Sequence, residues 1–351
     1  MSRYPVERLR TFIESVFLAV GALGEHAAVV ADRLIEADLR GRTGHGLMRV
    51  RPFAERAIAG GINLRPNIVL AGETPVSAVV DGDNGLGPVV MTMAAEVAIG
   101  KAKESGLAWV GTRRSNHAGA AGVYTALALR EDLIGIYFAV AAGNVMPPWG
   151  GRQRLLGTNP LAVALPAGKE VPFQLDIATT VASHGTIRVL EALGEPMPEG
   201  WVVDPQGRPI TDPALAHEGF LVPIGGYKGA GLNFVIGALA GIMNGAAFGS
   251  EVVGASHPLN TPTNTGQAML VMRPDLFLEL EQYRGEMDRQ LREFRASESM
   301  TDEPVRLPGE RAAQLEAQQR LQGILLPEPL RADLNALAAK LGLADRLDLA
   351  D

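Results

Sequence analysis

The 351-residue chain contains no cysteine. Disulfide bonds, thiolate metal sites and cysteine nucleophiles are therefore excluded. The chain has no surplus of basic residues either. It contains 32 lysines and arginines against 39 aspartates and glutamates, which gives a formal net charge of −7. An acidic chain without a basic run is not expected to bind nucleic acid or an anionic membrane, although a local basic site for a small anion remains open.

The sequence also lacks a segment typical of secretion or of membrane insertion. The first residues, MSRYPVERLRTFIESVF, carry a charge every few positions and no apolar core, so we expect no signal peptide. The most apolar long window, residues 232–249, contains an asparagine near each end and four glycines. That composition predicts a buried helix rather than a membrane span. We therefore expect a cytoplasmic protein.

Standard catalytic and nucleotide-binding motifs are missing as well. The glycines of the one candidate turn, DGDNGLG at 81–87, are in the wrong order for the G-x-G-x-x-G dinucleotide fingerprint. No Walker A loop, G-x-S-x-G elbow or H-E-x-x-H helix is present. The six histidines are scattered without metal-ligand spacing, so no metal site is expected.

The order of the expected elements indicates an α/β protein with helical ends. Apolar residues at helical spacing predict helices near both ends of the chain, over 7–23, 25–40, 47–59, 274–297, 309–322 and 329–341. Short apolar runs between them predict strands, among them 107–112, 133–142, 161–165, 171–176 and 268–272. Since strands alternate with helices in the middle, we expect an α/β domain over 66–273. Residues 1–65 plus 274–351 would form a helical domain, with the C-terminal helices folded back beside the N-terminal ones.

Two histidines have neighbours that suggest chemistry. In RTGHGLMRV (42–50), His45 lies between glycines and Arg49 follows four residues later, so a helix would place both on one face. Arg49 would then hold a carboxylate while His45 moves a proton; the alternative is a solvated capping turn. His117 follows an expected strand and precedes small residues, which would leave it accessible where ligands of α/β sheets bind. An imidazole there is expected to titrate near neutrality; the alternative is a histidine at a helix start.

Three further segments suggest contacts with a nucleotide. Lys228 lies in a glycine loop, PIGGYKGAGLNF, that opens a helix, where amide groups and the lysine would attract an anion; the alternative is a flexible turn. Asp176 ends an expected strand, where it would accept a hydrogen bond from a ribose hydroxyl. Pro308 opens another helix, whose free N–H groups either meet a phosphate or ribose or are simply capped. His184, between serine and glycine, is either a third accessible imidazole or, in the interpretation that we prefer, a turn residue.

Six segments together resemble one family. After ADLRGRTGHGLMRV (37–50), the segments VDGDNGLG, SNHAGAAG, LGTNPLAVALP, LDIAT and GGYKG follow in the family's order. They resemble the malate/L-lactate dehydrogenase-like family of NAD(P)-dependent oxidoreductases, which is distinct from the Rossmann-fold lactate and malate dehydrogenases. The family includes ureidoglycolate and sulfolactate dehydrogenases, diketogulonate reductase and Δ1-piperideine-2-carboxylate reductases. The resemblance extends to RLPGERAA near residue 306 and so covers most of the chain.

The resemblance implies a non-Rossmann, mixed-sheet domain that binds NAD or NADP, and a homodimer with its active site near the subunit interface. The helical domain would then serve substrate binding and dimer formation. His45 and Arg49 match a His-Gly-x-x-Arg pair of the family, and either His117 or the position of His45 is the acid/base in different members. The family's cofactor contacts match Asp176, Ile177, Ala178, Lys228, Pro308, Gly309 and Glu310. Arg152 and Arg154 either bind a 2′-phosphate of the cofactor or cover a loop.

The chain departs from the family at three positions near the expected substrate. Gly44 replaces a serine, Tyr227 a histidine or tryptophan, and His184 an arginine. The expected reaction is hydride transfer that interconverts a small 2-hydroxy acid and its 2-oxo acid. The departures leave a cyclic imine 2-carboxylate, such as Δ1-pyrroline- or Δ1-piperideine-2-carboxylate, as an alternative substrate. A non-catalytic nucleotide- or anion-binding protein is the alternative from another functional class.

Overall fold

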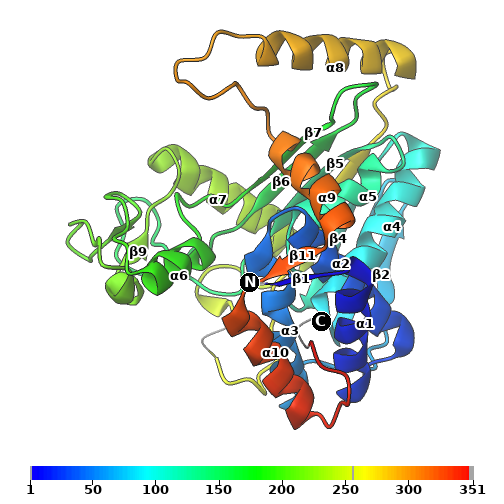
Figure 1. Cartoon of the computed structure of the whole chain (residues 1–351). Helices are drawn as coiled ribbons and strands as arrows, with labels where there is room; N and C mark the ends of the chain where they lie inside the picture. The colour runs from blue at the N-terminus through cyan, green and yellow to red at the C-terminus, as the bar shows by residue number, and fades with distance from the viewer. Residues whose placement is uncertain (1, 255–256, 348–351) are drawn as a thin grey trace.

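A seven-stranded mixed sheet forms the centre of the computed structural model, which describes residues 2–254 and 257–347 (Figure 1). In spatial order the strands are β2 (Val69–Thr74), β3 (Ser77–Gly85), β4 (Leu107–Ser115), β10 (Gln267–Met272), β5 (Ile134–Ala139), β6 (Leu161–Leu165) and β7 (Phe173–Ile177). β3 and β4 run parallel, and the other neighbouring pairs are antiparallel. The expected non-Rossmann mixed sheet is confirmed, because a Rossmann sheet is mostly parallel.

Helices cover both faces of this sheet. α4 (Gly87–Ser105) and α5 (Gly122–Leu129) lie on one side of it and α7 (Tyr227–Ala240) on the other (Figure 1). Side chains along β5 alternate between the two layers, as the period of a strand requires. Tyr137 and Ala139 belong to the apolar cluster of α4 and α5, whereas Phe138 packs in the cluster that contains Ala240 of α7.

The two ends of the chain pack into one helical body. The N-terminal part contains α1 (Val6–Ala19), α2 (Gly24–Leu39), two 3₁₀ turns, η1 (Thr43–His45) and η2 (Leu47–Arg49), and α3 (Val50–Ile58). The C-terminal part contains α9 (Glu310–Gln322), β11 (Ile324–Leu326) and α10 (Glu328–Lys340). β1 (Ser2–Tyr4) pairs antiparallel with β11, and Leu334 and Leu337 are buried in the same cluster as Phe12 and Phe17. The assignment of substrate and cofactor binding to separate domains stays a prediction.

α8 (Leu280–Arg295) is shorter than the helix expected over 274–297 and lies apart from the helical body, at the top of Figure 1. Asp288 attaches it to the turn between β6 and β7. The backbone N–H groups of Gly168, Lys169 and Glu170 donate to the Asp288 carboxylate at 2.8–3.1 Å. α8 is therefore attached to the sheet rather than to the helical body.

Several elements were not expected from the sequence. α6 (His184–Leu193) begins at the residue interpreted as a turn, and Ser183 caps it by accepting the Thr186 N–H at 3.1 Å. The short elements β8 (Val202–Val203), η3 (Pro213–Glu218), β9 (Phe220–Leu221), η4 (Ile242–Asn244) and η5 (Gly249–Glu251) follow. The expectation of a buried helix over 232–249 is wrong, because α7 ends at Ala240 and Phe234 and Ile242 are 57% and 61% exposed. In the described part of the chain, no helix combines the length and apolar character needed to cross a bilayer.

Candidate active site

The rings of His45 and His117 are stacked, with centroids 5.7 Å apart and planes 13° from parallel. His45 ends η1 in the helical body, and His117 follows closely after the last residue of β4. Phe53 of α3 packs against the His117 ring with 5.7 Å between centroids. The helical body and the sheet therefore meet at this pair, and the fold brings together two histidines that the sequence singled out separately.

A backbone hydrogen bond sets the tautomer of the His117 ring. The Gly119 N–H donates to Nδ1 of His117 at 3.1 Å, so a neutral ring carries its hydrogen on Nε2. Gly119 has a φ of +83°, in the left-handed region where other residues are strained. The neighbouring Ala118 and Ala120 are buried. The small residues after His117 thus form and pack this turn.

Both imidazoles are held in their neutral form. Burial, with the nearby charges of Arg49 and Arg42, lowers the pKa of His45 to about 4. Burial, with Arg49 and His45, lowers the pKa of His117 well below its ordinary value. The expectation that His117 titrates near neutrality is therefore wrong for the protein without ligand. An anion that neutralised Arg49 would raise both pKa values.

The turn that carries His45 and Arg49 rests on a buried carboxyl group. The Leu47 N–H donates to Oδ2 of Asp38 at 2.6 Å. Asp38 is 3% exposed, and burial raises its pKa to about 7. A Cβ at Gly46 would collide with this carboxyl group, which explains the glycine after His45. The two 3₁₀ turns present His45 and Arg49, in place of the single helical face expected from their spacing.

Arg49 is a half-buried cation that pairs with no carboxylate among residues 2–254 and 257–347. Its Nε donates to the carbonyl oxygen of Gly44 at 2.6 Å. Burial and the charge of Arg188, on α6, lower the pKa of Arg49. Sequence reasoning missed Arg188 because α6 itself was not expected. A Cβ at Gly44 would meet no heavy atom within 4 Å, so the turn has open space at this position.

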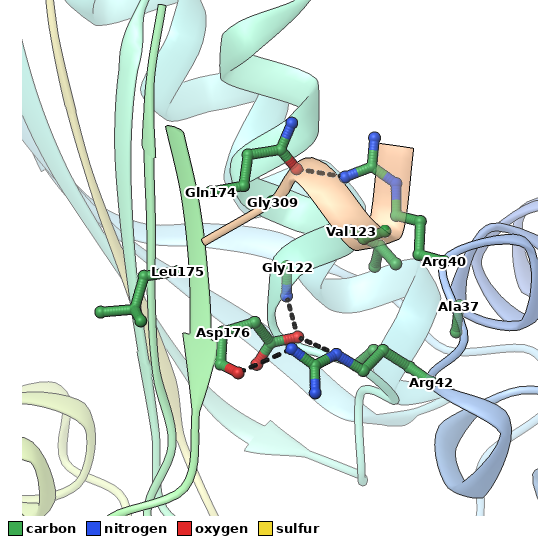
Figure 2. Close-up of a pocket in the computed structure, with 11 residues that line it drawn as sticks. Ala37, Arg40, Arg42, Gly122, Val123, Gln174, Leu175, Asp176 and Gly309 are labelled. Carbon is green, nitrogen blue, oxygen red and sulfur yellow. Dashed lines mark hydrogen bonds and ion pairs between the residues drawn. The ribbon is translucent and has the colours of Figure 1, made fainter. Parts of the chain in front are cut away.

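A cavity of about 50 Å³ lies between the helical body and β7, and Asp176 is one of the residues that line it (Figure 2). Arg42 donates from Nη2 to the backbone oxygen of Asp176 at 2.8 Å, and its Nε lies 3.5 Å from Oδ2. The Gly122 N–H, at the start of α5, donates to the same Oδ2 at 3.1 Å. Burial raises the pKa of Asp176, while Arg42 and the Gly122 N–H oppose that rise. The site thus offers a buried carboxyl group beside a cation.

Gly309, in the turn from Pro308 to Glu310, lines another wall of this cavity. The Gln174 N–H donates to the Pro308 carbonyl at 3.0 Å. Gly309 has a φ of +102°, and a Cβ there would lie 2.9 Å from the Gln174 nitrogen, so only glycine fits. Glu310 accepts the Leu307 N–H at 3.0 Å and forms an ion pair with Arg295 at 2.6 Å. The structure therefore brings Asp176 and Gly309 together, while the Glu310 carboxylate closes the turn.

The other expected cofactor residues lie outside that cavity. Ile177 ends β7, and Ala178 follows it. Lys228 is the second residue of α7 and is exposed, with no hydrogen bond or ion pair to the described residues. Trp149 is 62% exposed, and its ring lies against the glycine turn before Lys228. A Cβ added at Gly226 would lie 3.2 Å from the Trp149 ring.

These groups fit a nicotinamide dinucleotide. The Asp176 carboxylate suits ribose hydroxyls, and the exposed Lys228 suits a phosphate. The two arginines considered for a 2′-phosphate differ. Both are exposed, but Arg154 donates to the carbonyls of Gly219 and His217 at 2.6 and 2.7 Å and so holds a loop, whereas Arg152 makes no hydrogen bond to the described residues.

Comparison with known proteins identifies the family. The family model for malate/L-lactate dehydrogenase matches residues 4–335. The chain belongs to this family. It is accordingly an oxidoreductase, and the resemblance that we found in the sequence is confirmed.

Three relatives illustrate the range of the family. The L-sulfolactate dehydrogenase of Methanocaldococcus jannaschii is 38% identical over 339 residues, 96% of each chain. Its solved structure superimposes with a TM-score of 0.90 at 36% identity, covering 98% of each chain. An NAD(+)-dependent ureidoglycolate dehydrogenase of Escherichia coli is 37% identical, over 83% of this chain and 82% of that one. An NADP(+)-dependent (2R)-3-sulfolactate dehydrogenase of Chromohalobacter salexigens is 33% identical, over 91% of this chain and 93% of that one. The names of the relatives thus point to a nicotinamide cofactor in either form.

Proposed function

We propose that the protein interconverts a small 2-hydroxy acid and the corresponding 2-oxo acid, with NAD or NADP as cofactor. The observation that carries this proposal is the stacked pair of neutral imidazoles, His45 and His117, next to the unpaired cation Arg49. The carboxylate of a 2-hydroxy or 2-oxo acid needs a cation to bind it. The hydroxyl or oxo group of the same substrate needs a partner that moves a proton. The site supplies both.

The nicotinamide, when bound, accepts or donates the hydride, and the protein orients the reactants. Asp176, Ile177, Ala178, Lys228 and the turn from Pro308 to Glu310 are proposed to hold the dinucleotide. Arg49 binds the carboxylate of the substrate through its guanidinium.

His45 is proposed to carry the proton. His117 already uses Nδ1 to accept the Gly119 N–H, so its Nε2–H is suited to donate a hydrogen bond to the substrate oxygen. Neither ring nitrogen of His45 has a hydrogen-bond partner in the described residues, which leaves the ring free to accept a proton from a hydroxyl group. The position of His117 at the end of a strand favoured the reverse assignment, and the hydrogen-bond pattern supports this one.

The homodimer expected from the resemblance is part of the proposal. Phe234 and Ile242 are exposed and line an apolar cavity of about 600 Å³, together with Phe248. Apolar surface of this kind is typical of an interface between subunits. A cytoplasmic location stays a prediction.

The reaction is tested with purified protein, NADH or NADPH, and a panel of 2-oxo acids, by following the loss of reduced cofactor. We expect turnover of at least one 2-oxo acid and oxidation of its hydroxy acid in the reverse direction. Turnover of cyclic imine 2-carboxylates alone would instead support the imine reductase. Binding of NADH or NADPH without turnover of any oxo or imino acid would support the non-catalytic alternative.

A further inference from the structure

Two hydrogen bonds act on a single peptide group beside His117. The peptide that joins Ala118 and Gly119 donates its N–H to Nδ1 of His117 at 3.1 Å. Its carbonyl oxygen, which belongs to Ala118, accepts a hydrogen bond from the hydroxyl group of Tyr124. A trans peptide is planar, with its N–H and C=O on opposite sides, so a group that holds the carbonyl also fixes the direction of the N–H. The contact made by Tyr124 therefore acts on the His117 ring.

This peptide needs such a contact because its second residue is glycine. Gly119 has a φ of +83°, in a region that glycine adopts about as readily as one of negative φ. The peptide can therefore turn over with little strain, and it would then direct its carbonyl oxygen toward Nδ1 of His117 in place of the N–H. A ring that faced this oxygen would carry its hydrogen on Nδ1. The tautomer of His117 thus depends on the orientation of one peptide group.

Tyr124 is held firmly enough to fix that orientation. Its ring is fully buried and stacks on Tyr137 of β5, with 5.3 Å between the centroids and 17° between the planes. Burial raises the pKa of Tyr124, so the hydroxyl group keeps its proton and remains a donor. Gly122, the first residue of the same helix, donates its N–H to the Asp176 carboxylate at 3.1 Å. Tyr124 is therefore fixed relative to both the sheet and the proposed cofactor site.

The backbone on the other side of His117 is held by a separate set of contacts. Asn116 is 3% exposed, and its side-chain amide donates to the backbone oxygens of Asn84 and Gly85 at 2.9 Å each. Loss of the Tyr124 hydroxyl group would leave these contacts in place. The effect of that loss on the ring is therefore expected to pass through the peptide that follows His117.

We propose that Tyr124 is a positioning residue, which keeps the hydrogen of the His117 ring on Nε2 by locking the peptide between Ala118 and Gly119. This inference rests on the proposed function, in which the Nε2–H group donates to the oxygen of the substrate. Hydride addition to a 2-oxo acid builds negative charge on that oxygen, and a hydrogen bond to a charged acceptor is stronger than one to a neutral acceptor. Tyr124 is thus expected to affect the chemical step more than the binding of either reactant.

Nuclear magnetic resonance tests the tautomer directly. With isotopically labelled histidine, a ring nitrogen that carries hydrogen is distinguished from one that does not, and His117→Ala identifies the signals of this ring. At neutral pH we expect the unaltered protein to carry the hydrogen on Nε2 alone, and Tyr124→Phe to populate both tautomers. Tyr4→Phe is the matched control and should keep the single tautomer. Tyr4 is also buried and donates to a backbone carbonyl, that of Leu347 at 3.2 Å, but it lies in the helical body.

The kinetic test uses the same variants, with NADH or NADPH and a 2-oxo acid that the unaltered protein reduces. Tyr124→Phe should lower kcat about 3- to 10-fold, while KM for the acid and the affinity for the cofactor change less than about 2-fold. Tyr4→Phe should change none of these values, although it also loses a buried hydrogen bond and with it some thermal stability. A purely structural role of Tyr124 would leave kcat alike in the two variants.

The inference is overturned if Tyr124→Phe keeps the single tautomer, or if it lowers kcat no more than Tyr4→Phe does. Hydrogen on Nδ1 of His117 in the unaltered protein would overturn it as well, and that observation does not depend on the folding of any variant. Failure of the proposed function is distinguishable from these outcomes. If no 2-oxo acid is turned over, the comparison of tautomers still decides the role of Tyr124.

Discussion

Asp38 and Leu47 are joined by a hydrogen bond of 2.6 Å, from the backbone N–H of Leu47 to Oδ2 of Asp38, beneath the turn that presents His45 and Arg49. The carboxyl group is buried, and its pKa of about 7 lies above the ordinary value of 3.8. A proton on this group is therefore bound more tightly in the folded protein than in the unfolded chain. As the pH rises from about 4 to 7, the folded state loses this advantage, so Asp38 lowers the stability over that window.

Asp38→Asn should make the slope of stability against pH more positive. Between pH 4 and 7 Asp38 lowers the free energy of unfolding by up to about 1.4 kcal/mol per pH unit, whereas His45 and His117, with lowered pKa values, raise it as the pH rises. The variant removes the Asp38 contribution alone. The amide of the variant still accepts the Leu47 N–H but does not titrate. Denaturant unfolding at several pH values measures the slope. The exposed Asp302→Asn is the control, and an unchanged slope in Asp38→Asn would contradict the elevated pKa.

His45→Ala should lower kcat for oxidation of the hydroxy acid by about 10²–10⁴-fold and remove the acidic limb of its pH profile. A neutral imidazole accepts the hydroxyl proton, so the rate falls as the pH drops through the pKa of the ring. We expect His117→Ala to lower kcat while keeping the limb, and His217→Ala, on the exposed η3, to change nothing. If the limb disappears in His117→Ala and survives in His45→Ala, the two roles are exchanged.

Arg49→Lys should raise KM for carboxylate substrates more than it changes the affinity for the cofactor. Lysine keeps the positive charge but loses the planar fork that binds a carboxylate with two hydrogen bonds. Steady-state kinetics with a series of acids and separate NADH titrations distinguish the two effects. An unaltered KM across the series would mean that Arg49 only stabilises the turn through its contact with Gly44.

Lys228→Ala should weaken binding of the dinucleotide and leave folding intact. Loss of a charge-assisted contact with a phosphate corresponds to about 1.5–3 kcal/mol of binding free energy. Fluorescence titration with NADH and NADPH gives the affinities, with the exposed Lys340→Ala as the matched control. Unchanged affinity for both cofactors would refute the phosphate contact.

Phe234→Glu should shift the protein from dimer to monomer. The phenylalanine is 57% exposed and packs edge-on against Phe248 at 5.4 Å between centroids, in the wall of the apolar cavity. A carboxylate at this position would be desolvated in an interface, at a cost that opposes association. Light scattering after size-exclusion chromatography measures the mass, and Val76→Glu, in the turn between β2 and β3, is the control. A dimer that persists in Phe234→Glu would place the interface elsewhere.

The local sequence predicts most of the helices and strands, because the repeat of apolar residues that identifies each element can be recognised from a few neighbouring positions. It also singles out His45 and His117, since both lie among glycines and alanines. Their stacking was beyond local reasoning, because it depends on how α3 and η1 pack against the end of β4. The same limit applies to Asp38, which the sequence shows only as one acidic residue near the end of a helix. Its pKa is set by low-dielectric surroundings that the local sequence does not reveal.

Residues that depend on irregular segments were the hardest to predict. Arg188 lies on α6, which follows a loop of small polar residues and is only ten residues long. The 3₁₀ turns at 43–49 have spacing close to that of an α-helix, so the pattern predicted a common face but not the bend at Gly46. β1 and β11 are too short to recognise in the sequence. Their pairing also joins residues that lie far apart along the chain, so neither strand identifies the other.

That pairing has a consequence for biosynthesis. Leu334, Leu337 and Ala338 fill the core around α1 and α2, and among the described residues β11 is the strand that pairs with β1. A ribosome makes β11 and α10 after the sheet, so α1 and α2 emerge without the surface that buries them. These helices must therefore wait for the later segment, while the sheet between them can fold earlier. Synthesis of β11 and α10, rather than emergence of α1 and α2, would then time the assembly of the turn that carries His45 and Arg49.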